Sequence, residues 1–503
     1  MVTTPMLMRG KIPALLLAAL LAGAGARQDE YLRVDLRPEV SSGAVTAIAV
    51  SQELGQGPSL DFRMVAPVVY PGAPGVADRL VDLVVTDAAG AVPLVVTEDA
   101  AVPGGFPYYR HWRASRSVSY PLKISYRALV MPPQSRGGPP FGIRAVGGGV
   151  VGAGPGLLLL PDIENKGRIT VNWDLAAFGT GAIASSSFGD GSFTLQGSAK
   201  ALNEGWFLAG PAGIVPFKNG FGATWLGTPT FDAGAAMETA ARGYRYLAST
   251  FPHLRPTPPY RVFMQFRPEK SSGGTALLNS FMFWRGPLAP DEVPRVPLST
   301  IFHEMIHQWV GQIEGPVGVI SWFSEGLTSY YEHELPMRGG FISLADYEAS
   351  INRVSEDYET SKARNWSARK IAEVGFADEE VRHTPYRRSE LYFHDLDARI
   401  RAKSRGKRNL DDLVFSVFRT RERGQVFDEA RWIAMVVGEL GPAEEARFRG
   451  LIIDGVDRLE PREDSFGPCY TKVAATYQRN GATVTGHRWV RNANVPDATC
   501  RRY

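Results

Sequence analysis

The residues best suited to do chemistry form one short segment, His303-Glu304-Met305-Ile306-His307. Side chains four apart on a helix share a face, so both imidazoles can reach one metal ion. Zinc accepts imidazole and carboxylate ligands, and three protein ligands leave a position for water, whose pKa then falls towards neutrality. Glu304 would lie beside that water and could take its proton as general base. The segment therefore predicts a hydrolytic site holding one Zn²⁺ ion, with His303 and His307 as ligands.

A third ligand is expected from Ser321–Tyr331, which follows a turn containing Gly and Pro and has the composition of a second helix, antiparallel to the first. Glu325 falls in the first turn of that helix, where its carboxylate can face the metal. An acidic residue at a helix start is also favoured by the helix dipole alone. The metal role of Glu325 therefore depends on its partnership with the paired histidines.

The helix that carries the two histidines is expected over Thr300–Gln312, with Ser299 or Thr300 as its cap. A chance pair of histidines on a surface helix is the alternative, but apolar residues surround the pair. They are Ile301, Phe302, Met305, Ile306, Trp309 and Val310. Burying two imidazoles and a carboxylate among them would be costly without a purpose.

The sequence pattern that predicts strands and helices changes along the chain. From about Tyr31 to Phe231, short alternating stretches are punctuated by Gly, Pro, Ser and Asp, as in an all-β sandwich. From Ala235 onward helical spacing dominates, interrupted by a buried strand at Tyr260–Phe266. The predicted fold class is multidomain α+β, with an N-terminal all-β sandwich domain followed by a mostly α-helical catalytic domain.

The N-terminus has the pattern of a secretory signal peptide. Arg9 and Lys11 precede an apolar run, Ile12–Leu21, and small residues follow as far as Ala26. A membrane anchor is the alternative, although the run is short for a span of about 20 residues. We therefore expect export, to the periplasm or the medium, with no membrane contact beyond the signal peptide.

The two cysteines, Cys469 and Cys500, both stand near the end of the chain. In an exported protein an even pair indicates a disulfide. The predicted domains are a signal peptide (1–26), an N-terminal β domain (27–233), the catalytic domain (234–460) and a short disulfide-closed tail (461–503). A formal net charge of +3 argues against nucleic acid as the main partner, because phosphate binding needs a concentrated basic excess.

The motifs HEMIHQW and WFSEGLTSYY resemble those of the gluzincin metallopeptidases, closest to the glycyl aminopeptidase family and more distantly to the aminopeptidase N family. The resemblance implies a thermolysin-like catalytic domain, with zinc held by His303, His307 and Glu325 and with Glu304 as base. Thr384–Ser389 is similar to the PYxxG segment of the family. The similarity implies that Tyr386 stabilises the oxyanion of the tetrahedral intermediate.

A further segment, Gly273–Ser280, is similar to the GGLEH-type segment that holds substrate on an edge strand in the family. Gly273, Gly274 and Asn279 match and are the expected substrate-binding residues. The Glu and His of the family pattern are replaced by Ala276 and Leu277. Because that Glu anchors the free amine of the substrate in related aminopeptidases, its loss implies altered recognition of the substrate N-terminus.

The function predicted from these residues is zinc-dependent hydrolysis of peptide bonds in a peptide or protein substrate, by an aminopeptidase-like enzyme with altered N-terminal recognition. Two alternatives stay open. One is a non-catalytic relative that keeps zinc but only binds peptides. The other is a zinc hydrolase of a non-peptide substrate, because an ester or epoxide could use the same metal and base.

Overall fold

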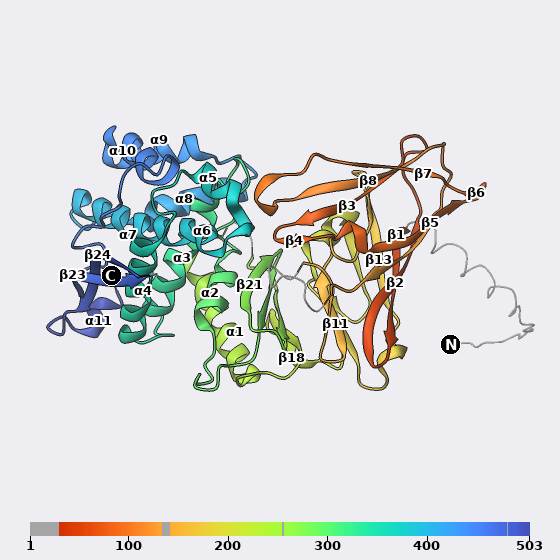
Figure 1. Cartoon of the computed structure of the whole chain (residues 1–503), viewed down its shortest axis with the longest axis horizontal. Helices are drawn as coiled ribbons and strands as arrows, with labels where there is room; N and C mark the ends of the chain where they lie inside the picture. The colour runs from red at the N-terminus through yellow and green to blue at the C-terminus, as the bar shows by residue number, and fades with distance from the viewer. Residues whose placement is uncertain (1–29, 133–140, 254–255, 480, 503) are drawn as a thin grey trace, which may run out of the picture.

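A computed structural model of the chain describes residues 30–132, 141–253, 256–479 and 481–502. Strands fill one side of the molecule, and most of the helices lie on the other side (Figure 1). The predicted signal peptide, 1–26, lies outside the described residues, so export stays a prediction. Among the residues that the structure describes, no helix combines the length and the apolar character that a membrane span requires.

The strand-rich half contains three sheets, and one buried core lies between them. A seven-stranded sheet runs in the order β16-β13-β1-β2-β9-β5-β6, and two five-stranded sheets pack with it. Burial alternates along Leu122–Leu129, the strand β9, as the period-two pattern requires of a sheet with one face on the core. The strands are β1 (Glu30–Ser41), β2 (Ala44–Leu54), β3 (Arg63–Tyr70), β4 (Ala73–Pro74), β5 (Leu80–Asp87), β6 (Gly90–Ala91), β7 (Leu94–Glu98), β8 (Tyr108–Ala114), β9 (Leu122–Leu129), β10 (Arg144–Val146), β11 (Gly149–Ala153), β12 (Leu160–Pro161), β13 (Lys166–Trp173), β14 (Ile183–Ser186), β15 (Gly189–Asp190), β16 (Phe193–Ser198) and β17 (Trp206–Gly210).

Two further strands, β18 (Gly213–Lys218) and β19 (Phe221–Leu226), belong to a different sheet from the strands before them. Their sequence pattern predicts that they belong with the N-terminal strands, but β19 pairs in parallel with β20 (Tyr260–Phe266). Alternation shows that a segment is a strand and does not show which sheet it joins, because pairing is a non-local property. The domain limit at 233 stays a prediction, and the sheet of the catalytic half begins at Gly213.

This second sheet runs β18-β19-β20-β22-β21, with β22 at Ser280–Arg285 and β21 at Ser272–Leu277. The central strand β20 is buried along nearly its whole length, which explains its continuous apolar sequence. Helix α1 (Ala233–Thr250) begins at the cap Asp232, whose side chain accepts from the Ala235 amide, and packs beside α2 (Leu298–Ile306). The edge strand β21 contacts α2, which brings the predicted substrate segment to the helix that carries the two histidines.

The remaining helices complete the catalytic half, and α3 and α7 form its most extensive helix pair. A Cβ atom at Gly326 of α3 would overlap the Ser389 Cβ of α7, so glycine permits this close approach. The helices are α3 (Ser321–Arg338), α4 (Leu344–Thr360), α5 (Ala368–Val374), α6 (Glu379–Arg382), α7 (Thr384–Ser404), α8 (Leu410–Glu422), α9 (Glu429–Leu440), α10 (Ala443–Phe448) and α11 (Asp497–Cys500).

Helix α2 is shorter than the sequence predicts. It ends at Ile306 rather than Gln312, because the backbone then turns through bonds from Gln308 to Met305 and from Trp309 to Ile306. The predicted cap is also wrong, since Pro297 precedes the helix and no side chain caps it. His307 keeps a helical backbone conformation at the end of α2, so the four-residue spacing of the histidines survives.

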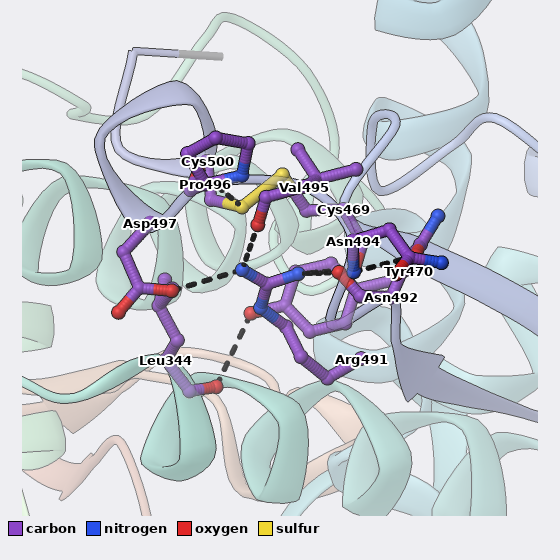
Figure 2. Close-up of a disulfide and its surroundings, with 10 residues drawn as sticks. All are labelled: Leu344, Cys469, Tyr470, Arg491, Asn492, Asn494, Val495, Pro496, Asp497 and Cys500. Carbon is purple, nitrogen blue, oxygen red and sulfur yellow. Dashed lines mark hydrogen bonds and ion pairs between the residues drawn. A yellow bond between two sulfur atoms is a disulfide. The ribbon is translucent and has the colours of Figure 1, made fainter.

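The C-terminal tail contains a β-hairpin that the sequence analysis did not predict, β23 (Tyr470–Arg479) and β24 (Ala482–Arg491). Its backbone at Trp489 makes two hydrogen bonds, of 2.7 and 2.8 Å, with the Asn352 side chain of α4. The predicted Cys469–Cys500 disulfide is present, with the Cα atoms 5.6 Å apart (Figure 2). By closing a loop of 31 residues it stabilises the tail by about 3 to 4 kcal/mol in the chain-entropy model.

Candidate metal centre

Three side chains from α2 and α3 converge on one point. The Nε2 atoms of His303 and His307 lie 3.2 Å apart, and the Glu325 Oε2 atom lies 3.3 Å from the first and 3.5 Å from the second. Ligand atoms about 2.0 to 2.1 Å from one zinc ion in a tetrahedron are separated by about 3.3 to 3.4 Å. The predicted ligands are therefore together, at the spacing that one small ion requires.

Hydrogen bonds on the far side of each imidazole fix which nitrogen faces this point. The His303 Nδ1 donates to Glu332 over 2.9 Å. The Thr328 hydroxyl donates to the Ser324 carbonyl at 2.6 Å, so it can only accept from His307 Nδ1, at 3.3 Å. Each imidazole therefore uses its Nδ1–H in a hydrogen bond and turns its Nε2 towards the carboxylate of Glu325, the orientation that a metal ligand needs.

Burial alone would lower the pKa of His303, but its hydrogen bonds to Glu325 and Glu332 raise it well above its usual range. The cluster therefore favours a positive charge between these side chains, which a bound metal ion would supply. Burial alone would raise the pKa of Glu325, but His307 and His303 hold it well below its usual range, so the carboxylate stays ionised. The donor set of two imidazoles and one carboxylate is the one that zinc takes in hydrolytic sites. These residues fit a zinc ion.

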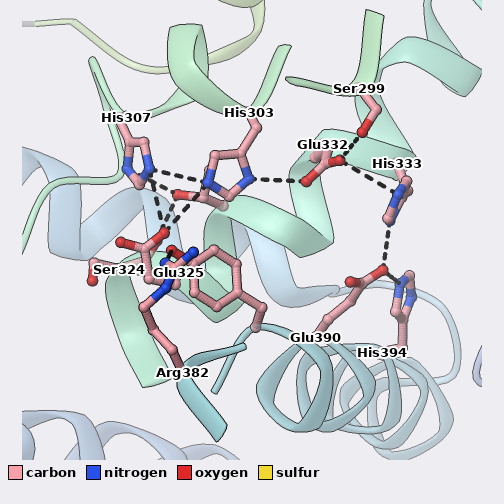
Figure 3. A network of polar contacts seen from close by, with 12 residues as sticks. Ser299, His303, His307, Ser324, Glu325, Glu332, His333, Arg382, Glu390 and His394 are labelled. Carbon is pink, nitrogen blue, oxygen red and sulfur yellow. Dashed lines mark hydrogen bonds and ion pairs between the residues drawn. The ribbon is translucent and has the colours of Figure 1, made fainter. Parts of the chain in front are cut away.

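Behind His303 a chain of polar contacts runs from Glu332 to His333, Glu390 and His394 (Figure 3). The Glu332 carboxylate lies 2.9 Å from His303 Nδ1 and accepts a hydrogen bond from Ser299, the residue that the sequence suggested as a helix cap. Burial opposes its ionisation, but His333 and His303 lower the pKa of Glu332 to about 2. His333 itself bonds Glu390 at 2.6 Å, so it supports this chain and does not face the metal ligands.

Glu332 and Thr328 were not predicted from the sequence, although their spacing on α3 is a signal for them. Counting from Glu325, Thr328 is three residues on and Glu332 seven, so all three share one face of α3. A search of the Glu325 helix for polar residues at these spacings would have found both supporting groups.

The Glu332→Gln variant is expected to bind zinc about 10- to 100-fold more weakly, because the amide keeps a hydrogen-bond acceptor but removes the charge that makes His303 a stronger ligand. The measurement is a competitive titration with a chelator. The matched control is Glu334→Gln, a buried glutamate of α3 that contacts Tyr347 and Arg338 instead. Equal zinc affinities in wild type and Glu332→Gln would contradict this role.

Glu304 lies beside the ligands with its carboxylate against the edge strand. It is 6% exposed, and no described residue donates a hydrogen bond to its side chain. Burial raises its pKa to about 7, which suits a group that must gain and release a proton near neutrality. A Cβ atom at Gly274 would lie 2.5 Å from Glu304 Oε1, so only glycine lets β21 pass this close.

Tyr386 comes from the first turn of α7, and its ring stacks on that of His303, with centroids 5.8 Å apart and planes 14° from parallel. Burial first, and then the Glu325 carboxylate, raise the pKa of the phenol well above its usual range. The hydroxyl therefore keeps its proton and can donate a hydrogen bond.

The predicted substrate residues lie on or next to the edge strand. Gly273 faces the Trp284 ring, where a Cβ atom would lie 2.5 Å away. Asn279 occupies the turn after β21 with φ of 52°, a conformation that asparagine tolerates, and its side chain accepts from Gln308, the residue after His307. Gly274 and Ala276 share one face of the strand, towards α2, so the site has a methyl group where the family pattern has a carboxylate.

The segment that carries the candidate metal centre is similar to a known family. Residues 297–395 match the family model for M61 glycyl aminopeptidase. This segment is therefore similar to the M61 glycyl aminopeptidases. The matched residues include the three candidate ligands, Glu304 and Tyr386. A search of curated protein sequences finds no match.

Solved structures share the fold of this chain. An aminopeptidase N family protein from Idiomarina loihiensis is 15% identical, with a TM-score of 0.68 over 85% of this chain and 77% of its own. An M1 zinc metallopeptidase from Deinococcus radiodurans, solved as a mutant bound to a Tyr-Ser-Ala substrate, is 17% identical, with a TM-score of 0.51 over 86% and 96%. The leukotriene A4 hydrolase of Saccharomyces cerevisiae is 12% identical, with a TM-score of 0.51 over 86% and 68%.

Proposed function

We propose that this protein is a zinc metallopeptidase that cleaves peptide bonds with Glu304 as general base and Tyr386 as donor to the oxyanion. The observation that carries the proposal is the Glu304 side chain, which lies beside the ligand histidines, is only 6% exposed and accepts no hydrogen bond from a described residue. Its burial raises the pKa of the carboxylate, and titratable groups with such shifts concentrate where a group must react.

In this mechanism His303, His307 and Glu325 would hold a zinc ion, which would supply a Lewis acid that lowers the pKa of a water molecule towards neutrality. Glu304 takes a proton from the attacking water and later delivers it to the leaving amine. The Tyr386 hydroxyl donates to the oxygen on which negative charge develops. The outer edge of β21 offers backbone groups to a substrate that lies beside it as an added strand.

The substrate class follows from the residue at position 276. The free amino group of a substrate would be desolvated here and would meet the methyl group of Ala276 instead of a carboxylate. Because the charged amine would then have no partner, binding of a free N-terminus is disfavoured. We therefore propose that the enzyme acts on N-blocked or internal residues rather than on free N-termini.

The test uses two fluorogenic peptides that differ only in N-acetylation, assayed with and without a chelator. The acetylated peptide is expected to be cleaved at least as well as the free one, and chelation should abolish both activities. In Ala276→Glu, the ratio of kcat/KM values should shift towards the free peptide by about 10-fold or more, the worth of a charged hydrogen bond. A strong wild-type preference for the free amine would overturn this substrate class.

The Tyr386→Phe variant is expected to lower kcat by on the order of 10²-fold with little change in KM, because the lost hydrogen bond forms mainly in the transition state. Steady-state kinetics on the acetylated peptide provide the measurement. Since the ring and its stacking on His303 remain, zinc content should not change. Unaltered kcat would remove Tyr386 from the mechanism.

A further inference from the structure

Arg382, the last residue of α6, lies against Tyr386 one turn further along the chain. Its Nη1 atom donates to the Tyr386 hydroxyl oxygen at 3.4 Å, and its guanidinium carbon lies 5.9 Å from the centre of the tyrosine ring. The guanidinium is also held by Glu379, which accepts from Nε at 3.0 Å and from Nη2 at 2.8 Å. A fixed cation therefore faces the phenol oxygen.

This contact decides which way the Tyr386 hydroxyl points. A phenol oxygen that accepts a hydrogen bond from an arginine must direct its own proton elsewhere. The positive charge also draws electron density from the oxygen, which makes the hydroxyl a stronger donor. Because the ring lies over His303 and the hydroxyl is within hydrogen-bonding reach of Glu325, the proton is directed towards the metal ligands, where the substrate carbonyl would lie.

The packing around Arg382 holds it in this place. Its guanidinium carbon lies 5.4 Å over the ring of Phe376, and the Phe106 ring of the strand-rich half meets Phe376 edge-on at 5.8 Å. The two halves touch closely here, because a Cβ atom on Gly375 would overlap the Gly104 carbonyl oxygen. Arg382 is left 25% exposed, with its aromatic support provided in part by the other half of the chain.

We propose that Arg382 is a positioning residue for peptide-bond hydrolysis, which orients and polarises the Tyr386 hydroxyl towards the oxyanion. The inference rests on the proposed function, since it assigns a task to Arg382 only through Tyr386. It also gives the turn at Pro103–Gly105 a role in the site, because Phe106 after this turn supports Phe376 beneath the arginine.

The test is a double-mutant cycle on kcat with the acetylated peptide, using Arg382→Gln, Tyr386→Phe and the double variant. Arg382→Gln is expected to lower kcat by on the order of 10- to 100-fold, the range for a hydrogen bond to a charged group, with KM changed less than about twofold. In the Tyr386→Phe background it should lower kcat no further. Arg382→Lys, which keeps the charge, should recover part of the loss.

The matched control is Arg399→Gln. Arg399 lies on α7 with a similar exposure of 26%, and its ion pair is with Glu444, so its loss should leave kcat unchanged. Zinc content and thermal unfolding of each variant separate a local effect from a folding defect.

Three outcomes would overturn the inference while leaving the proposed function in place. They are an unchanged kcat in Arg382→Gln, an equal fall in both backgrounds, and a rise in KM alone, which would make Arg382 a substrate-binding group. If Tyr386→Phe itself retains full turnover, the proposed role of Tyr386 fails together with this inference.

Discussion

The Glu304→Gln variant is expected to keep its zinc and to lose turnover by on the order of 10²- to 10⁴-fold, the usual contribution of a general base. Glutamine has nearly the same shape, so the fit of β21 against position 304 through Gly274 should be preserved. The amide cannot take a proton from water. The ligands themselves are untouched, which is why metal and activity should separate in this variant.

Two measurements on purified protein check this prediction, zinc per chain by elemental analysis and kcat on the acetylated peptide. A full complement of zinc with lost turnover assigns Glu304 to the proton transfer. Near-normal hydrolysis would refute that role. Loss of zinc together with activity would mean that Glu304 belongs to the ligand set instead.

The Glu325→Ala variant is expected to lose zinc, and with it all metal-dependent turnover. Removing this carboxylate leaves two neutral imidazoles on the ion and takes away the only negative charge among the three ligands. Zinc affinity should fall by more than the ~10- to 100-fold expected for Glu332→Gln. The reason is that Glu325 binds the ion directly, whereas Glu332 only hydrogen-bonds one of the ligands.

The control for this variant is Glu356→Ala, an exposed glutamate of α4. It should bind zinc as tightly as the wild type. Competition with a graded series of chelators measures both variants. Wild-type affinity in Glu325→Ala would show that the ion is held by other residues.

The metal site was predictable because its geometry is local. His303 and His307 are four apart on a helix, and Glu325 stands in the first turn of the next helix, so spacing alone brings two ligands together and limits the search for the third. Tyr386 was found through the resemblance of its segment to a known motif, and its place over His303 agrees with that.

What the sequence did not reveal depends on contacts between distant segments. Sheet assembly sets both the pairing of β19 with β20 and the passage of Gly274 against Glu304, and neither can be read from one segment. The early end of α2 has the same origin, because the turn after Ile306 lets Trp309 stack on Phe251. Packing between distant segments therefore determines the strand pairing, the position of β21 and the end of α2, which the spacing of residues along the sequence does not predict.

The binding of one zinc ion between His303, His307 and Glu325 can be tested by a crystal structure of the purified protein with anomalous data on both sides of the zinc absorption edge. We expect a single strong zinc peak within about 2.0 to 2.2 Å of the two Nε2 atoms and a Glu325 oxygen. A peak held by other residues, or protein that contains no transition metal, would contradict this expectation.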